Sequence, residues 1–569
     1  MPSKMVTSNA PRARTANAPT ILAHVPPRWA LTITVAGAFL FRLLLMRYRF
    51  AVAFDEVNYL KLGVSGYLNG LSDVLHTYWS PLLPALISFF CLFFENFELA
   101  GRLVPIVAGS LLPLPVYFLA QRVYDRKVGL VAAAFVAVFP PLAFQSTQIL
   151  TEPVYMLFGA LAILFGLDAL QRSAFRFAVL AGLSSGLAYL AHPQAVGFFL
   201  MLVFWFVATF VVKWFPLPRR RTAVLLAGVG LAFLLMASPY LLFLKQTTGK
   251  WTFSAKASAN LQMDTPDREG GDPFRSLDPT NRFVPIDQIF HQGNFLQATD
   301  GGARPVRAVR LKPFVLKYVK NVTKVLREAI PQLLTTVPML LLGVGLLGAR
   351  WPAGRGKAVL YLLSFLAFFW LLVIPAFHIN LRYFSPLWPV CAVWVGRGAL
   401  LVQNWLQQEG GLQAWAGRFR LSAGGLALGL VAAGFVALSF LPELGRVVGR
   451  RADNPDYWAD PVEQKQAGLW LKEHAKPPIV IMSRYHTADI YAGNYDITKS
   501  ITLPRSSLER ILQYAKHRGA RYLMLNERYM KQYPQLRFLL KEDARYEGLR
   551  LIYRDTNQAG LVTVIYEIL

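Results

Sequence analysis

Apolar residues occur along this chain in long runs that short polar segments separate. Most runs are about 17 to 25 residues long, the length that an α-helix needs to cross the hydrocarbon core of a bilayer. The predicted spans are approximately residues 29–46, 103–121, 128–145, 153–171, 177–191, 195–212, 222–244, 331–349, 358–376, 384–402 and 422–442. The pattern predicts a polytopic α-helical membrane protein with about eleven transmembrane helices.

The apolar segment PLLPALISFFCLFF, residues 81–94, departs from this pattern. It has only 14 residues and contains Pro81 and Pro84. A segment of this length is typical of an interfacial or re-entrant helix rather than of a crossing. We therefore do not count it as a span.

Basic residues indicate the direction of the spans, because short cytoplasmic loops collect Lys and Arg. With residues 81–94 left out, the predicted inner segments carry basic clusters such as PRRR, residues 218–221, whereas the short outer loops contain one basic residue, Arg382. The N-terminus is therefore predicted to lie inside and the C-terminus outside. Arg47 and Arg49, just beyond the first span, are exceptions to this rule.

This topology divides the chain into three parts. Residues 1–28 are polar, Pro-rich and basic, and are predicted to be a cytoplasmic tail that stays attached to the first span, since no persuasive cleavage site follows it. Residues 29–442 are predicted to form the transmembrane domain, with large outer loops at 47–102 and 245–330. Within residues 443–569, WLKEHA and SSLERILQYAKHRG predict helices, and PPIVIMS, ARYLMLNE, LRLIYR and LVTVIYEI predict short strands. A small soluble α/β domain outside the cytoplasm is expected there.

Composition narrows the choice of partners. The chain has 569 residues, is 54% hydrophobic and carries a formal net charge of +27. Because the basic residues lie between apolar runs, membrane lipids are the expected partner and nucleic acid is not. Cys91 and Cys391 are the only cysteines, and both have apolar neighbours, so neither a disulfide framework nor a thiolate metal site is expected.

Two acidic motifs fall on the predicted outer side. Asp55 and Glu56 follow the stretch AVAF in the first outer loop, and Glu152 lies in the next outer turn, in LTEPVY. Carboxylates close to a bilayer are costly and are commonly functional. One reaction near the membrane surface could use both motifs. The alternative is that these carboxylates are solvated or cap helices.

A basic segment covers residues 304–328, which contain eight Lys or Arg and one acid. Lys317, Lys320, Lys324 and Arg327 recur at helical spacing, so one face of the predicted helix is cationic and the other is apolar. Such a helix lies in the membrane interface. It serves either general anchoring to phospholipids or the binding of a lipid-linked phosphate.

Arg382, in LRYFSPLWPV, opens a span on the outer side against the charge rule. Its guanidinium needs a compensating anion, either a phosphate or a structural ion pair with Asp55 or Glu152. Further candidates for phosphate or substrate binding lie at outer ends of spans. They are His192, Lys245, Lys250 and His378, of which the histidines have a structural, hydrogen-bonded role as the alternative.

Several apparent nucleotide motifs can be set aside. GVGLLG, residues 343–348, fits the pattern G-x-G-x-x-G, but it lies inside an apolar span with no preceding strand, so it predicts helix packing. The sequence contains no P-loop, nucleophile elbow, kinase signature or Cys/His metal pattern. A nucleotide-driven reaction therefore has no visible site.

Five motifs, in this order, carry a family resemblance: FDEVNYLKLG, TYWSPLLPAL, LTEPVY, AHPQAVG and LRYFSPLWPV. Together they resemble the GT-C superfamily of polyprenyl-phosphate-sugar-dependent glycosyltransferases over residues 29–442. The bacterial members of the protein mannosyltransferase type, a group that includes the aminoarabinose transferases acting on lipid A, are the most similar. The domain after residue 442 also looks like those appended to bacterial members.

The resemblance implies that a sugar moves, with inversion, from an isoprenoid phosphate to a glycan, lipid or protein acceptor at the outer face of the bacterial cytoplasmic membrane. Asp55 would be the general base for the acceptor hydroxyl or amine. Glu56 would orient Asp55 or the acceptor. Glu152 would position donor or acceptor, or share a divalent metal with Asp55; the metal itself stays open.

The resemblance also assigns the binding residues. Arg382 and the basic residues at the outer ends of spans would hold the departing lipid phosphate. Tyr78 and Trp79 would contact the sugar or belong to the interfacial aromatic belt. Two departures affect this assignment, because the second acidic position is Glu rather than Asp and HPQ replaces the more usual Arg-Pro pair.

A secondary transporter or a flippase of a lipid-linked substrate is the main alternative, and a non-catalytic polysaccharide-assembly protein is a third option. Transporters typically show internal repeats and charged residues at mid-span, whereas here no repeat is visible and the acids cluster in loops. The identity of the sugar and of the acceptor does not follow from the sequence.

Overall fold

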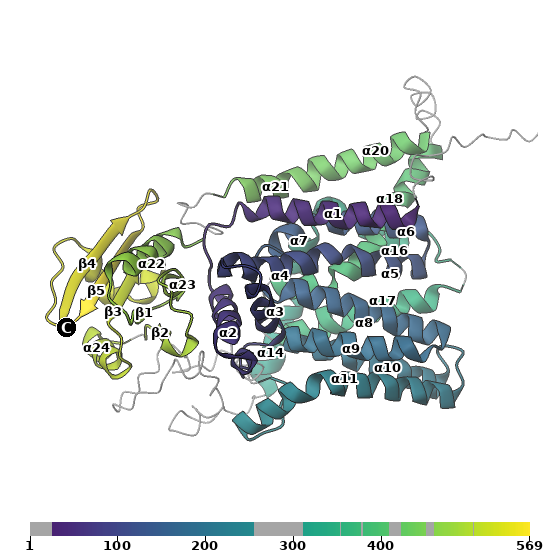
Figure 1. Ribbon diagram of the computed structural model, residues 1–569. Helices are drawn as coiled ribbons and strands as arrows, with labels where there is room; N and C mark the ends of the chain where they lie inside the picture. The colour runs from purple at the N-terminus through teal and green to yellow at the C-terminus, as the bar shows by residue number, and fades with distance from the viewer. Residues whose placement is uncertain are drawn as a thin grey trace, which may run out of the picture.

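The computed structural model describes residues 26–254, 311–352, 354–376, 379, 381–408, 423–450, 460–504 and 506–569. Long helices lie side by side in a bundle, and a domain with a β-sheet lies at one end of it (Figure 1). The helices before the sheet domain are α1 (Pro27–Met46), α2 (Asp55–Asn69), α3 (Leu82–Cys91), α4 (Phe97–Leu111), α5 (Pro113–Val123), α6 (Arg126–Val138), α7 (Pro140–Gln145), α8 (Glu152–Arg172), α9 (Phe175–Ala191), α10 (Val196–Val212), α11 (Arg219–Thr248), α14 (Leu311–Lys324), α15 (Ile330–Leu334), α16 (Thr336–Leu347), α17 (Gly356–Ala367), α18 (Trp388–Gln408), α20 (Ala423–Phe435) and α21 (Leu441–Val448).

Among the described residues, eight helices are long and apolar enough to cross a membrane, and a ninth span results if the bent pair Phe314–Leu333 and Thr336–Leu347 counts as one. Two of the eleven segments expected from the sequence are shorter than the others. α9 has only 17 residues, and the segment expected at 128–145 is divided into α6 and α7. The prediction of a mostly helical membrane fold is confirmed. α3 has 10 residues, which agrees with the prediction that this segment does not cross.

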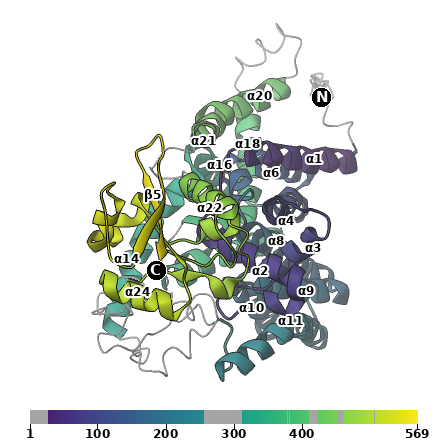
Figure 2. The ribbon, with the colours of Figure 1, turned by 60° about the vertical axis from the view of Figure 1, so that its left-hand side comes forward.

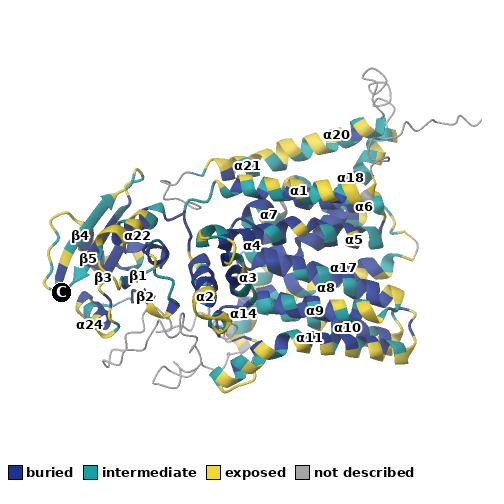
Figure 3. Cartoon of the chain, in the orientation of Figure 1, coloured by how far each residue is buried: buried dark blue, intermediate teal, exposed yellow. Residues whose placement is uncertain are grey.

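Burial distinguishes the helices inside the bundle from those at its surface (Figure 3). The apolar part of α8 is 83% buried, whereas that of the segment Ala423–Val448 is only 11% buried. Leu231 and Leu235 on α11 are 70% and 69% exposed. Large exposed apolar side chains would be unfavourable in water, so these outward faces are suited to contact with lipid.

A buried cation, Arg42 of α1, lies at the break between α6 and α7. Pro140 has no N–H, so it cannot donate to the carbonyl of Val136 as a helix would require. The guanidinium of Arg42 lies 3.4 Å from that carbonyl oxygen and donates to the carbonyl of Ala137 at 2.9 Å. The charged side chain in a predicted span is thus used to satisfy backbone groups that a broken helix exposes. It thereby supports α7 and the turn that leads to α8.

The C-terminal domain contains five strands in the order β2-β1-β3-β5-β4, in which the first three are parallel and the last two pairings are antiparallel. Its elements are α22 (Val462–His474), β1 (Ile481–Ser483), α23 (Thr487–Tyr491), β2 (Ile501–Thr502), α24 (Leu508–His517), β3 (Tyr522–Asn526), β4 (Leu549–Thr556) and β5 (Val562–Ile568). α22 and α23 pack on one face of the sheet, and α24 packs on the other. The expected α/β domain is confirmed.

α2 and α3 lie between the bundle and the C-terminal domain (Figures 1 and 2). α2 packs against α3 and α4 on the bundle side and against α23 on the side of the sheet domain. The N-terminus of α2 is Asp55, so the first acidic motif lies where the two parts of the molecule meet.

Glycines set the distance between α16 and α18. A Cβ atom added at Gly345 would lie 1.8 Å from the carbonyl oxygen of Trp394, and one added at Gly398 would lie 1.9 Å from that of Leu341. The helices therefore touch backbone to backbone at this point. The prediction that the GVGLLG segment serves helix packing is confirmed.

We expect Gly345→Ala to destabilise the protein by about 1 to 3 kcal/mol or more, because the helices must move apart to admit the methyl group. Gly343→Ala in the same helix is the matched control, since nothing lies within 4 Å of its added Cβ. Thermal unfolding of both variants in detergent measures the difference. Equal midpoints would contradict the packing role of Gly345.

Candidate functional site

Asp55 and Glu56 begin α2, and Glu152 begins α8. Carboxylates in the first turn of a helix are stabilised by the unpaired N–H groups there and by the helix dipole. Neighbouring positions of a helix point about 100° apart, because an α-helix has 3.6 residues per turn. Asp55 and Glu56 consequently enter two different networks.

Arg382 joins the two acidic motifs. It lies in a single 3₁₀ turn, Leu381–Tyr383, and its Nη2 donates to Oδ2 of Asp55 at 2.6 Å. Its Nε lies 3.5 Å from Oε1 of Glu152. The side chains of Asp55 and Arg382 are 30% and 27% exposed, whereas that of Glu152 is 5% exposed. The starts of α2 and α8 thus converge on one guanidinium that is still partly exposed. The structural ion pair of Arg382 with Asp55 or Glu152, which the sequence left as an alternative, is present.

Aromatic side chains surround Asp55. Tyr59 lies one turn after Asp55 on α2, and its ring packs edge to face on Trp79, which in turn packs on Tyr78. Burial raises the pKa of Tyr59 well above its usual value, and the carboxylates of Asp55 and Glu152 raise it further. Burial and Asp55 likewise raise the pKa of Tyr78. Both hydroxyls thus remain protonated even well above neutral pH and can act as hydrogen-bond donors.

The turn that carries Tyr78 and Trp79 is held by a histidine. Nδ1 of His76 accepts hydrogen bonds from the N–H groups of Tyr78 (3.0 Å) and Trp79 (3.2 Å). The hydroxyl of Tyr240 on α11 donates to the carbonyl of His76 at 2.9 Å. This turn is thereby fixed both locally and to the bundle.

His192 lies beside the first turn of α8. Its ring stacks on Tyr155, one turn after Glu152 on α8, with centroids 5.3 Å apart, and lies 6.4 Å from the ring of Tyr383. Its Nδ1 accepts a hydrogen bond from the N–H of Gln194. The structure thus brings His192 next to the residues that flank Arg382.

The other basic candidates lie elsewhere. Lys245 donates to the carbonyl of Gly249 at 2.7 Å and so caps its own helix, α11. Lys250 is exposed just beyond that helix. His378 lies outside the described residues, as does the segment 304–310 of the basic run.

The described part of the basic run forms α14, which packs against the chain just before Arg382. The side-chain amide of Asn321 donates to the carbonyl of Pro375 at 2.9 Å, and the hydroxyl of Tyr318 bonds the carbonyl of Leu371. Lys317 and Arg327 belong to this helix and to the turn after it. These bonds hold α14 to the segment 371–375, which precedes Arg382 in the sequence.

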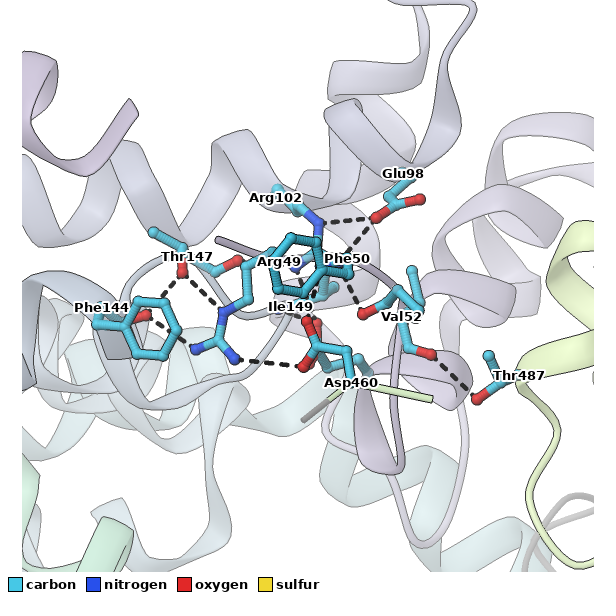
Figure 4. Close-up of polar contacts among 12 residues, drawn as sticks. Arg49, Phe50, Val52, Glu98, Arg102, Phe144, Thr147, Ile149, Asp460 and Thr487 are labelled. Carbon is cyan, nitrogen blue, oxygen red and sulfur yellow. Dashed lines mark hydrogen bonds and ion pairs between the residues drawn. The ribbon is translucent and has the colours of Figure 1, made fainter. Parts of the chain in front are cut away.

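Glu56 belongs to a buried network rather than to the pair around Arg382. Figure 4 labels Glu98, Arg102, Thr147 and Ile149 of this network. It accepts from the N–H of Ile149 at 3.0 Å and pairs with Arg102 of α4 at 3.3 Å. Arg102 also pairs with Glu98 at 2.8 Å and donates to the carbonyl of Thr147 at 2.9 Å. The network ties the start of α2 to the turn before α8, and so fixes the spacing of the two acidic motifs. The direct role expected for Glu56, to orient Asp55 or the acceptor, stays a prediction.

Arg49, an exception to the charge rule, has its own partners. It donates to the hydroxyl of Thr147 at 2.9 Å and to the carbonyl of Phe144 at 3.1 Å, and it lies 3.8 Å from Asp460 (Figure 4). Its guanidinium also stacks on the ring of Phe144. The charge is thus compensated by a residue of the C-terminal part, which a count of basic residues in loops does not consider.

Sequence reasoning missed Tyr59, His76, Arg102 and Tyr383 as parts of this site. A signal existed for Tyr59, because residues four apart on a helix share a face and Asp55 is the first residue of α2. Glu98 is a local partner of Arg102 on α4, but the contacts that join Arg102 to Glu56, Thr147 and Ala51 come from distant segments, so no local signal linked it to the site.

A divalent metal finds few ligands in the described part of the chain. No group of three His, Cys, Asp or Glu that could hold a metal occurs there. Asp55 and Glu152 both face Arg382, and two carboxylates supply only part of the six or more oxygen ligands that a hard cation prefers. Among the described residues only these two carboxylates converge here, and a guanidinium lies between them, so we assign no step to a metal.

Comparison with known proteins supports the fold. The profile of the family described as dolichyl-phosphate-mannose-protein mannosyltransferase matches residues 78–243. The archaeal oligosaccharyltransferase AglB from Archaeoglobus fulgidus, solved in complex with an inhibitory peptide and a dolichol-phosphate, is 14% identical with a TM-score of 0.57, over 89% of this chain and 70% of that one. ArnT from Cupriavidus metallidurans, solved with bound undecaprenyl phosphate, is 13% identical with a TM-score of 0.54, over 95% of this chain and 98% of that one.

A search among curated protein sequences found no match. The structural similarities show that the chain has the fold of the GT-C superfamily, and the resemblance drawn from the five sequence motifs is confirmed at that level.

We expect Glu56→Gln to lower the free energy of unfolding by about 2 to 4 kcal/mol, because it removes the negative partner of a buried guanidinium. Glu443→Gln is the control, since its partner Arg446 is 75% exposed and such surface pairs contribute about 1 kcal/mol or less. Chemical denaturation in detergent measures both. A Glu56→Gln protein as stable as the control would show that this network does not hold α2 to the turn before α8.

Proposed function

We propose that this protein is a membrane glycosyltransferase that moves a sugar from a polyprenyl-phosphate donor to an acceptor hydroxyl or amine. One observation carries the proposal: in a GT-C fold, Asp55 and Glu152 meet at a single guanidinium at the end of the bundle. A base, a second carboxylate and a phosphate-matching cation are the groups that this reaction needs side by side. The two similar proteins solved with a dolichol-phosphate or undecaprenyl phosphate support the class of donor.

In the proposed reaction, the acceptor oxygen or nitrogen attacks the anomeric carbon of the sugar. The bond from that carbon to the phosphate oxygen breaks, and the electron pair leaves with the polyprenyl phosphate. The carboxylate of Asp55 takes the acceptor proton. Attack opposite to the leaving group inverts the configuration at the anomeric carbon.

The pair between Asp55 and Arg382 explains how donor binding would prepare the base. Both side chains are partly exposed, so separating this ion pair costs less than separating a fully buried one. A donor phosphate can therefore take over Nη2 of Arg382 through a charge-assisted contact and release Asp55 for the acceptor. Glu152 would hold Nε of the same guanidinium meanwhile. As the sugar leaves, Arg382 would stabilise the charge that develops on the phosphate.

The surrounding residues take supporting parts in this proposal. Tyr59 and Tyr78 would donate hydrogen bonds to the sugar or acceptor, and Trp79 would pack beside them. Glu56 would act through Arg102, by holding α2 at the correct distance from α8. The basic helix α14 would attract the donor headgroup to the membrane surface.

The location follows from the distribution of charge. The short loops at the ends of spans that are predicted to be inside collect Lys and Arg. We therefore propose that the protein is a multi-pass protein of the bacterial cytoplasmic membrane, with its N-terminus inside and with Asp55 and the C-terminal domain at the outer face.

Asp55→Asn should reduce sugar transfer by about a hundredfold or more, because the amide cannot accept the proton. Binding of radiolabelled polyprenyl phosphate should change little, since the amide keeps its shape. Asp73→Asn is a control on the chain just after the same helix, where Asp73 bonds Ser65 and Asn69 and not the site. Unchanged transfer would remove Asp55 from the mechanism, and donor movement across vesicles without glycoside formation would favour a transporter or flippase.

Arg382→Lys should raise the donor KM by about tenfold, because a lysine keeps the charge but loses the planar fork that matches a phosphate. Arg172→Lys is the matched control, as Arg172 pairs with Asp168 at the opposite end of α8. Steady-state kinetics with varied donor separates the two variants. A donor KM that does not respond to Arg382→Lys would argue against phosphate binding there.

A further inference from the structure

The segment Arg49–Phe54 leads from α1 to Asp55 and has no regular secondary structure across most of its length. Its backbone groups are bonded by side chains of the C-terminal part. The N–H of Phe50 donates to Oδ2 of Asp460 at 2.8 Å, and the carbonyl of Phe50 accepts from Nζ of Lys465 at 3.0 Å. These contacts satisfy backbone groups that an irregular buried segment would otherwise leave without partners.

The same arrangement recurs two residues later. The N–H of Val52 donates to the hydroxyl of Tyr491 at 2.9 Å, and the carbonyl of Val52 accepts from the hydroxyl of Thr487 at 3.0 Å. Both partners belong to α23, which follows β1 in the C-terminal sheet. Figure 4 shows Thr487 beside Val52 and Asp460 beside Phe50. α23 and the start of α22 thus bind the backbone of this segment at Val52 and Phe50.

The residue just before Asp55 is held in an unfavourable conformation. Phe54 has φ 50° and ψ −121°, in the region that favours glycine. Such a conformation in a non-glycine residue costs of the order of 1 kcal/mol or more and persists only where the surroundings enforce it. The ring of Phe54 packs edge to face on Tyr485 of the C-terminal domain, with centroids 5.0 Å apart.

A buried ion pair holds the body of α2 to the same domain. Nζ of Lys61 donates to Oδ2 of Asp489 at 2.7 Å and to the hydroxyl of Ser500 at 2.6 Å, and both charged side chains are fully buried. Burial alone would raise the pKa of Asp489, but Lys61 and His486 lower it below its usual range. The carboxylate therefore stays charged at neutral pH, and its Oδ2 faces Lys61, Ser500 and His486.

Tyr491 connects the segment before Asp55 to the network around Arg102. Its hydroxyl accepts from Val52 and donates to Oε2 of Glu98 at 2.9 Å. Glu98 pairs with Arg102, which pairs with Glu56. A single hydroxyl of the C-terminal domain thus contacts both the segment that presents Asp55 and the network that spaces α2 from α8.

We propose that the C-terminal domain is a positioning element of the active site, which fixes Asp55 by binding residues 49–54 and α2. Tyr491 and Thr487 are the key positioning residues. The proposal rests on the proposed function of Asp55 as the base. It implies that the domain does more than cover the membrane part, because a displacement of the proton acceptor by about 1 Å can lower a rate by about a hundredfold.

The test compares Tyr491→Phe with Tyr566→Phe in the full-length protein. Both remove a buried hydroxyl from the same domain, but the hydroxyl of Tyr566 donates to the carbonyl of Leu539 and does not touch residues 49–56. We expect Tyr491→Phe to lower kcat about tenfold with the donor KM changed by less than about threefold, and Tyr566→Phe to leave both constants unchanged. Thr487→Val should act in the same way as Tyr491→Phe, and Thr487→Ser should restore kcat because it keeps the hydroxyl.

A second measurement does not depend on catalysis. Hydrogen–deuterium exchange of the amides in residues 49–56 should accelerate about tenfold in Tyr491→Phe and Thr487→Val but not in Tyr566→Phe or Thr487→Ser. Unaltered exchange and kcat in Tyr491→Phe and Thr487→Val would overturn the proposal, even if Asp55→Asn is inactive. If Asp55→Asn is active, the proposed base is wrong, while the exchange data still decide whether the domain holds this segment.

Discussion

The site depends on the contacts of one guanidinium, that of Arg382, with two carboxylates. The guanidinium lies between carboxylates that begin two different helices, and each of them would repel the other without a cation between them. The N-termini of α2 and α8 add favourable dipoles for these carboxylates. The pair with Asp55 is partly exposed, whereas Glu152 is buried. In the proposed reaction, the donor phosphate would take the place of Asp55 while Glu152 holds the arginine. The proposed chemistry uses both properties.

The networks behind this pair differ from it in burial. Glu56, Arg102, Lys61 and Asp489 are almost wholly removed from solvent. Buried charges of this kind add little net stability, since desolvation offsets most of their attraction, but breaking one pair is strongly destabilising. Such pairs select a single arrangement of the segments that they join. Here they determine where α2 lies relative to α8 and to the C-terminal domain.

Several arginines of the membrane part bind backbone carbonyls or an acidic partner. Arg42 satisfies carbonyls at the break before Pro140, and Arg49 pairs across to Asp460. Arg397 of α18 likewise binds backbone carbonyls: it donates to those of Gly345, Ala349 and Arg350 at the end of α16. Arg42 and Arg397 thus act as caps for broken or terminating helices. Their charge alone does not mark them as inner or outer residues.

The sequence by itself determined the class of the fold, because the length and apolarity of a span are local properties that a bilayer imposes on every crossing helix. The helical bundle, the short helix α3 and the α/β domain followed from such patterns, as did the packing role of Gly345. Asp55, Glu152 and Arg382 could also be picked out, since each is a charge in an apolar context. Which charge pairs with which was decided only by the tertiary structure. Arg382 and Asp55 are 327 positions apart, and Tyr491 and Val52 are 439 apart. Partners at such separations meet through the packing of whole helices and domains, which no local pattern of residues records.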